Sequence, residues 1–404
     1  MNLYTTAFDV HRFRKQFSSL QSGIAHFDGP GGSQVPDAVG RAISETLCSS
    51  ISNRGTITIP EKKADDVVLE FRKAVADFLD ADPEGIVFGR SWTALAYDFS
   101  RAIAKTWKKG DEIVVTRLDH DSNIRPWIQA AEAVGVQVKW VDFDSTTGEL
   151  LPEHLERVMS SKTRLVAMTG ASNIIGTRPD IKRMIEITHQ VGAIFVLDSV
   201  HLAPHASISL HELGADIVGC SAYKFMGPHC GILAAKPSLL AELENDKLLP
   251  STNQVPERFE LGTLPYELLA GVTAAIQFIA EISSDTKANR KEQLKKSMHI
   301  IESYESELLS YLNSSLRQVK GMQLVGSPHK RTPTLYFRIE GQDSKAIHHY
   351  LASKQISAPA GNFYALEASR WLGLGDAGAV RVGLAPYSTR SEVDRLVQAL
   401  HEFN

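Results

Sequence analysis

The sequence predicts an α/β protein whose large domain is a mostly parallel, seven-stranded sheet between helices, followed by a smaller α+β domain. Two observations support this prediction. Between about residues 65 and 235, short apolar runs rich in β-branched residues alternate with amphipathic helical stretches. Beyond about residue 265, long helical patterns replace this alternation. A chain of 404 residues is long enough for two domains.

The first part of the chain contains runs that fit strands buried on both faces, because they are apolar throughout rather than alternating. They lie at residues 86–88, 112–115, 136–141, 164–168, 193–197, 216–220 and 231–235. Between strands, apolar residues recur at helical spacing, as in Val67, Phe71, Val75 and Phe78. Such alternation predicts parallel strands joined by helices that cover both faces of the sheet.

The second part has a different pattern. Helices are expected at 265–282, about 287–318, near 343–354 and near 364–372, and strands at 334–339 and 379–384. A final helix begins after Thr389, because Thr389 and Glu392 have the spacing of a capping box. We therefore divide the chain into an N-terminal arm (1–24), a large domain (25–264) and a small C-terminal domain (265–404).

Composition and charge argue against several classes of function. The formal net charge of -4 gives no electrostatic reason to bind nucleic acid. We find no signal peptide and no apolar run that fits a membrane span, and we expect a cytoplasmic protein. The three cysteines, Cys48, Cys220 and Cys230, are too few and too scattered for a disulfide framework or a zinc site, so no metal is expected.

Polar residues stand directly after the predicted strands, where an open α/β sheet binds its ligands. Asp198 and Lys224 each follow such a strand. A lysine that forms an imine and an aspartate that pairs with a pyridinium nitrogen are what pyridoxal 5'-phosphate (PLP) requires. Its phosphate would need N–H groups at a helix N-terminus together with hydroxyls. The sequence offers these groups at Ser91, Trp92, Thr93 and Ser221.

The order of these residues resembles the class V aminotransferase family of fold-type I PLP enzymes, and within it the cysteine desulfurase and selenocysteine lyase branch. The similarity runs from about Ala25 to the C-terminus. Its most specific part extends from VLDSVH (196–201) to SAYKFMGP (221–228). Further matching segments are HFDGPGGSQVP (26–36), GDEIVVTRLDHDSNIRPW (110–127), SNIIGT (172–177), FELGT (259–263) and RVGLAPYST (381–389). The resemblance implies the fold-type I architecture and PLP as the cofactor.

The resemblance also implies roles for individual residues. Three are implied to be catalytic: Lys224 holds the cofactor and moves protons, Asp198 pairs with the ring nitrogen, and His120 stacks on the ring. Arg381 would bind the substrate carboxylate as a bidentate pair, with Asn53 also on the substrate side. The other residues implied to contact the cofactor are Asn173, His201, Ser91, Trp92, Thr93, Ser221, Tyr223 and Thr263. Since Thr263 would reach in from a second subunit, a homodimer with shared active sites is expected.

The sequence departs from the pattern of this branch at several positions. His201 stands in place of a glutamine, Tyr223 in place of a histidine, and Trp92 and Ala94 in place of a threonine and a glutamate. The largest departure is Tyr364, which occupies the position of the nucleophilic cysteine of desulfurases, with Pro359 in place of an arginine. Desulfuration requires a thiolate to attack the substrate sulfur, so the sequence argues against a working desulfurase.

Without that cysteine, we expect an enzyme that binds a small amino-acid substrate as an external aldimine and removes its Cα proton. A carbon–sulfur lyase is the favoured function, because the branch that the chain resembles handles sulfur. An aminotransferase, an epimerase and a true cysteine desulfurase are alternatives. Outside this class, two hypotheses stay open: an inactive PLP-fold binding subunit, and a nucleotide-dependent oxidoreductase. The oxidoreductase is disfavoured because no G-x-G-x-x-G follows the first strand.

Overall fold

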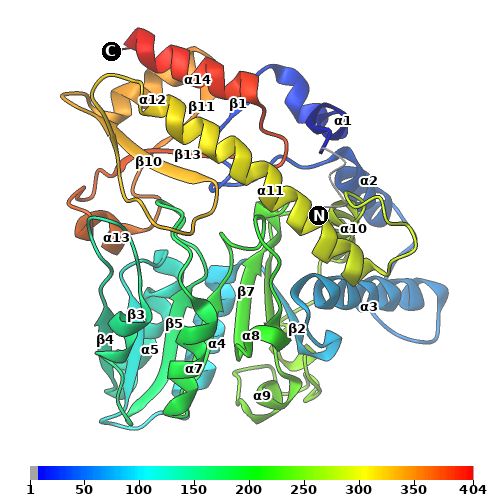
Figure 1. The fold of residues 1–404 in the computed structure, drawn as a ribbon. Helices are drawn as coiled ribbons and strands as arrows, with labels where there is room; N and C mark the ends of the chain where they lie inside the picture. The colour runs from blue at the N-terminus through cyan, green and yellow to red at the C-terminus, as the bar shows by residue number, and fades with distance from the viewer. Residues whose placement is uncertain (1–7, 404) are drawn as a thin grey trace.

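The computed structural model describes residues 8–403, and a seven-stranded sheet in the order β2-β8-β7-β6-β5-β3-β4 forms its centre (Figure 1). β8 runs antiparallel to both of its neighbours, β2 and β7, and all other neighbours pair in parallel. The predicted mostly parallel, seven-stranded sheet is therefore confirmed. Its strands are β2 (Ile86–Gly89), β3 (Glu112–Thr116), β4 (Gln137–Val141), β5 (Thr163–Thr169), β6 (Ile194–Asp198), β7 (Ile217–Ser221) and β8 (Gly231–Ala235).

Successive residues of these strands face two separate hydrophobic cores. On β5, Leu165 and Ala167 belong to one core, and Val166 and Met168 belong to the other. Burial on both faces is the reason that the strands are apolar throughout. The core of Leu165 also contains α4 (Trp92–Ala104) and α5 (Arg125–Val134). The core of Val166 contains α3 (Ile59–Leu79), α7 (Ile181–Gln190) and α10 (Tyr266–Ala280).

Short helices connect these elements, and none of the helices within residues 8–403 has both the length and the apolar character that crossing a membrane requires. The short helices are α6 (Pro152–Glu156), α8 (Leu210–Leu213), α9 (Pro237–Glu242) and α13 (Leu366–Trp371).

A second sheet, in the order β12-β13-β10-β9, forms the smaller α+β part of the molecule. The predicted capping box is present, because Glu392 accepts the Thr389 N–H at 2.8 Å and Thr389 Oγ1 accepts the Glu392 N–H at 3.3 Å. The short strands β9 and β12 are absent from the sequence prediction, since so few residues show no periodicity. The strands are β9 (Met322–Leu324), β10 (Thr334–Ile339), β12 (Ala360–Gly361) and β13 (Ala379–Gly383), and the helices are α11 (Arg290–Leu316), α12 (Ser344–Ser353) and α14 (Arg390–Phe403).

The chain crosses between the two parts of the molecule more than once. β1 (Ala25–His26) pairs in parallel with β11 (Ile356–Ser357), and Phe27 packs into the core beneath β10 and β13. In the other direction, α10 packs on α2 (Asp37–Leu47) and α3, as Figure 1 shows. The boundary between residues 264 and 265 stays a prediction. Of the predicted N-terminal arm, residues 1–7 lie outside the described residues, and α1 (Val10–Arg14) is its first helix.

A close approach of β7 to α4 generates a test of the packing. A Cβ atom added at Gly219 would lie 2.2 Å from the Trp92 ring, which is 2% exposed. We predict that Gly219→Ala lowers the free energy of unfolding by about 1–3 kcal/mol, because a buried indole has no space to move into. Thermal unfolding followed by circular dichroism measures this change. Gly40→Ala on α2 is the control, since no atom lies within 4 Å of that site. Equal melting temperatures for both variants would contradict the packing.

Candidate active site

A cavity of about 820 Å³ lies at the carboxyl ends of the parallel strands, where open α/β sheets bind ligands. Its walls come from loops after β2, β3, β5, β6 and β7, and from Asp28, Phe363, Tyr364 and Arg381. The structure brings most of the predicted site residues to this one cavity: Ser91, Trp92, Thr93, His120, Asn173, Asp198, His201, Ser221, Tyr223, Lys224 and Arg381. Asn53 and Thr263 are exposed and lie outside its lining.

Asp198 is the last residue of β6 and is 3% exposed. Its Oδ1 accepts the Val200 N–H at 2.9 Å, and its Oδ2 accepts the indole N–H of Trp92 at 2.9 Å. Burial raises the pKa of this carboxyl to about 6, although both donors and the charge of Lys224 lower it. A cation beside this carboxylate would favour its ionised form, and a pyridinium N–H is such a cation.

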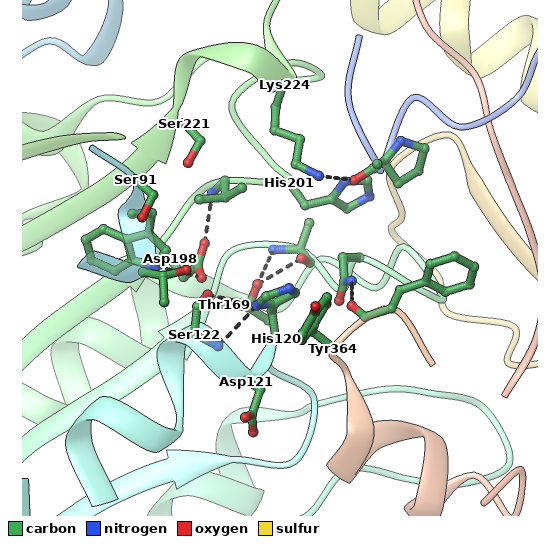
Figure 2. A pocket seen from close by; sticks show the side chains of 18 of the residues that line it. Ser91, His120, Asp121, Ser122, Thr169, Asp198, His201, Ser221, Lys224 and Tyr364 are labelled. Carbon is green, nitrogen blue, oxygen red and sulfur yellow. Dashed lines mark hydrogen bonds between the residues drawn. The ribbon is translucent and has the colours of Figure 1, made fainter. Parts of the chain in front are cut away.

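Lys224 lies on the turn after β7, and its amine donates a hydrogen bond to the Pro30 carbonyl. Burial, and after it the charge of Arg381, lowers the pKa of the Lys224 amine to about 7. A substantial fraction of the amine is therefore neutral near neutral pH, which is the form that attacks an aldehyde. Figure 2 shows Lys224 reaching in from the side opposite to His120 and Tyr364.

His120 is neutral and has a defined tautomer. Its Nδ1 accepts the Ser122 N–H at 3.1 Å, so the ring proton belongs on Nε2. Burial, and after it the nearby charges of Lys224 and Arg381, lowers the pKa of this imidazole to about 3. The ring lies 5.6 Å from the ring of Tyr364, between centroids. A flat, neutral ring on a cavity wall can stack on a planar ligand.

Buried polar atoms of cavity-wall residues that have no hydrogen-bond partner within residues 8–403 include Nδ1 of His201 and Oδ1 of Asn173. The other polar atom of each of these two side chains has hydrogen-bond partners. His201 Nε2 lies 3.0 Å from the Thr332 hydroxyl and 3.1 Å from the Thr334 hydroxyl, and Asn173 Nδ2 donates to the Phe363 carbonyl at 2.9 Å. Buried polar atoms are nearly always paired, so these two indicate a polar ligand.

The N-terminus of α4 forms another polar part of the wall. Ser91 is its N-cap, and the Ser91 hydroxyl accepts the Ala94 N–H at 3.0 Å. A Cβ atom at Gly231 would lie 2.4 Å from the Trp92 nitrogen, so glycine is required where β8 passes under this turn. The hydroxyls of Thr93 and Ser221 belong to residues that line the same cavity. Free N–H groups of a first helical turn, together with hydroxyls, suit a phosphate.

Arg381 is buried on β13 and joins three parts of the chain. Its Nη2 lies 2.6 Å from Asp28 Oδ1, and its Nη1 donates to the Asn173 carbonyl at 3.1 Å. The Phe363 ring lies 3.8 Å from the guanidinium carbon. Sequence reasoning missed Asp28 and Phe363 as site residues, because Asp28 stands 353 positions from its partner. The matching segment HFDGPGG was the signal that could have drawn attention to Asp28.

Tyr364 lies at the cavity wall with 74% of its surface exposed. Phe363 and Tyr364 have φ angles of 53° and 58°, a region that residues other than glycine seldom adopt. The Asp121 N–H donates to the Tyr364 carbonyl at 2.7 Å, which holds this turn against the loop after β3. Strained backbone of this kind is often found at functional sites.

None of the cysteines belongs to the cavity lining within residues 8–403. Cys220 lies within β7 and Cys230 directly precedes β8, and both are buried, whereas Cys48 is exposed at the end of α2. Burial raises the pKa of the Cys230 thiol to about 12 and raises that of Cys220 as well. Neither buried thiol is a ready source of thiolate.

Comparison with known proteins identifies this arrangement. A family model described as Aminotransferase class-V matches residues 25–396. The chain belongs to the class V aminotransferase family. An uncharacterized protein of Mycobacterium tuberculosis, MT3887, is 35% identical over 98% of this chain and 99% of its own length. A probable cysteine desulfurase of Halalkalibacterium halodurans is 30% identical over 98% of each chain. The solved structure of a cysteine desulfurase from Thermococcus onnurineus shares the fold, with a TM-score of 0.88 at 24% identity, over 100% of this chain and 99% of that one.

As a class V aminotransferase family member, the protein is a PLP-dependent enzyme with the fold-type I architecture. The cavity fits this cofactor at separate points. The unpartnered Nδ1 of His201 can meet a ring oxygen, the unpartnered Oδ1 of Asn173 can accept a hydrogen bond from a ligand, and the start of α4 can meet a phosphate. The carboxylate of Asp198 can meet a ring nitrogen, and the amine of Lys224 can meet an aldehyde.

The lowered pKa of Lys224 predicts how this class V enzyme captures its cofactor. Protonation below that pKa of about 7 removes the nucleophile, so covalent capture of added PLP by the apoprotein should accelerate as pH rises through this value. Stopped-flow absorbance over a pH series measures the rate, and borohydride trapping with peptide mass analysis locates the bond. Lys224→Ala should capture none. A midpoint near the ordinary lysine value of about 10.4 would contradict the prediction.

Proposed function

We propose that this protein is a PLP-dependent carbon–sulfur lyase, which cleaves the Cβ–S bond of a cysteine-derived amino acid without forming an enzyme persulfide. The observation that carries the proposal is Tyr364. This residue lies at the cavity wall. By the resemblance of the sequence to the desulfurase pattern, it stands in the place of the nucleophilic cysteine, and a phenol cannot accept the sulfur. The membership of a family with cysteine desulfurase relatives supports a sulfur-containing substrate.

The residues that would hold the cofactor are distributed around the cavity. Asp198 would pair with the ring nitrogen, and the neutral His120 would cover one face of the ring. The phosphate would lie against the first turn of α4 and the hydroxyls of Thr93 and Ser221. His201 Nδ1 would gain in the ring oxygen the partner that it lacks. When bound, PLP supplies a cationic ring that accepts the electron pair released at the substrate Cα.

Lys224 is the base of the proposed reaction. Its neutral amine takes the Cα proton, and the pKa of about 7 suits both the uptake and the return of a proton near neutral pH. The sulfur then leaves with the electron pair of the Cβ–S bond and takes up a proton. The other product, 2-aminoacrylate, reacts with water to give pyruvate and ammonia. Substrate and water thus yield a thiol, pyruvate and ammonia, and no oxidant or reductant is required.

Arg381 would bind the substrate carboxylate. Its guanidinium is buried, and Asp28 and the Asn173 carbonyl hold it in place. Its Nε has no partner within residues 8–403 and remains available for a carboxylate oxygen. Removal of the Cα proton is also the first step of an aminotransferase or an epimerase. Those alternatives differ in their products.

The decisive experiment compares the products formed from free cysteine and from a panel of cysteine conjugates and sulfoxides. We predict pyruvate and ammonia in equal amounts and no protein-bound persulfide. The combined variant Cys48→Ser, Cys220→Ala, Cys230→Ala should keep its activity, apart from losses caused by altered core packing at the two buried positions. Alanine with protein persulfide would instead indicate a desulfurase, a new keto acid with aminated cofactor a transaminase, and loss of optical activity an epimerase.

We further propose a homodimer in the cytoplasm in which Asn53 and Thr263 serve the partner's active site. Both residues are exposed and lie outside their own cavity. Their segments contact each other, since Arg54 pairs with Glu257 at 3.1 Å. Large apolar side chains of the same region are exposed, which is typical of a surface that another subunit covers. They are Leu47 (65%), Ile57 (82%), Ile59 (82%), Leu248 (70%), Leu249 (98%) and Leu261 (60%).

Charged residues on this surface should dissociate the dimer. We predict that Leu248→Glu with Leu249→Glu shifts the protein toward monomer at micromolar concentration, because a buried unpaired carboxylate opposes association. Light scattering coupled to gel filtration measures the mass. Val134→Glu on α5, also an exposed apolar position at 39%, is the control and should leave the mass unchanged. A wild-type protein that stays monomeric would refute the dimer.

A further inference from the structure

Trp92 lies at the start of α4, and its side chain is almost entirely buried. It is the first residue of α4 and lies between Ser91 and Thr93 in the sequence. Its indole is 2% exposed and packs in the hydrophobic core between the sheet and α4. The indole N–H donates to Asp198 Oδ2 at 2.9 Å, from 106 positions away in the chain. One residue therefore connects the helix N-terminus with the carboxylate.

Two glycines on neighbouring strands create the space that this residue needs. A Cβ atom at Gly219 of β7 would lie 2.2 Å from the Trp92 ring, and one at Gly231 of β8 would lie 2.4 Å from its backbone nitrogen. The indole thus packs closely against β7, and the backbone at the start of α4 packs closely against β8. A rigid donor in a fixed position orients the oxygen that it contacts.

We propose that Trp92 is a positioning residue whose indole N–H orients Asp198 and stabilises its carboxylate as the counter-ion of the cofactor ring. This inference rests on the assignment of PLP and Asp198 in the proposed function, but it does not depend on which reaction the enzyme performs. The Val200 N–H holds the other carboxylate oxygen at 2.9 Å, so the carboxylate has one donor on each oxygen. One is supplied by the backbone and the other by this side chain.

The groups around Asp198 affect its ionisation, and the Trp92 indole N–H is one of those that favour the ionised form. Asp119, from the loop after β3, is a fully buried carboxyl whose pKa is raised to about 8 by burial and, in addition, by the charge of Asp198. Two buried carboxyls that repel each other both favour protonation. Lys224 acts in the opposite direction, and the charge of Asp198 in turn raises the pKa of Tyr223 and Cys220. Removing the indole N–H therefore favours protonation of Asp198.

The protonation state of Asp198 determines how the affinity for the cofactor depends on pH. A protonated Asp198 cannot balance a pyridinium charge, so cofactor affinity falls when the carboxyl takes up a proton. With the pKa of Asp198 at about 6, the intact site is mostly ionised above that pH. Loss of a donor raises this pKa further, and the loss of affinity should therefore be largest in mildly acidic solution and smallest in alkaline solution.

The test uses Trp92→Phe, which keeps a buried aromatic ring and removes the N–H. The dissociation constant of PLP from the apoprotein, measured by equilibrium dialysis, should rise about tenfold at neutral pH, the usual weight of one hydrogen bond to a charged group. The rise should be larger near pH 6, close to the pKa of the Asp198 carboxyl, than near pH 8.5, where this carboxyl is ionised. Trp107→Phe, in the same core and 7% exposed, is the matched control and should bind PLP as the wild type does.

A double-mutant cycle with Asp198→Asn separates positioning from packing. If the indole acts through the carboxylate, Trp92→Phe should change PLP affinity little once Asp198 has become an amide. Equal losses in both backgrounds, or equal losses for Trp92→Phe and Trp107→Phe, would overturn the proposal. So would wild-type affinity and pH dependence in Trp92→Phe. A wild-type apoprotein that binds no PLP refutes the cofactor assignment itself, whereas failed pyruvate release with these binding results intact refutes only the lyase.

A measurement on the wild type covers the case in which Trp92→Phe does not fold. The chain has 5 tryptophans, so indole-labelled apoprotein gives a small set of N–H resonances. One of them should shift on acidification with the titration of Asp198, and PLP binding should abolish that pH response by holding the carboxylate ionised. If no indole resonance shifts on acidification or on PLP binding, the proposed contact does not act on the carboxylate.

Discussion

A buried carboxylate at the end of β6 is the constraint on which the rest of this site depends. Burial favours the protonated form of Asp198, whereas the role that we propose for it, counter-ion of the cofactor ring, requires the ionised form. The fold resolves this conflict with hydrogen-bond donors on both oxygens and with the amine of Lys224 nearby. The same burial that opposes the charge of Asp198 lowers the pKa of Lys224 and keeps the amine reactive. The same dry environment therefore opposes the charge of Asp198 and favours the neutral amine of Lys224.

The substrate side of the cavity depends on contacts between distant parts of the chain. Arg381 comes from the second sheet, Asp28 from the segment after β1, and the Asn173 carbonyl from the loop after β5. β1 pairs with β11, so the chain places Asp28 beside β13 through the pairing of its first strand. A movement of the smaller sheet relative to the larger one would move Arg381 and Phe363 together. Arg381, which we propose to bind the substrate carboxylate, thus lies against the Phe363 ring at the cavity wall.

In our proposal, Tyr364 separates this chain from its desulfurase relatives, although the chain belongs to the same family. The residues that we propose to hold the cofactor are a lysine, an aspartate, a stacking ring and the start of α4, and all of these line one cavity. The loop that we propose to correspond to the sulfur acceptor of desulfurases is separate from them, and it carries Tyr364 on strained backbone. A change on that loop can therefore alter the fate of the substrate sulfur while the chemistry at Cα is preserved.

The sequence by itself determined the central sheet, the family and most of the cavity residues, because strands buried on both faces are apolar throughout and ligand residues follow their ends. It also indicated Lys224 and Asp198 as partners and the start of α4 as a phosphate turn. Only the tertiary structure revealed that the Trp92 indole donates to Asp198, that Asp28 pairs with Arg381, and that His201 has a nitrogen without a partner among residues 8–403. These are contacts between side chains far apart in sequence, and no local pattern encodes which atoms meet when helices and strands pack.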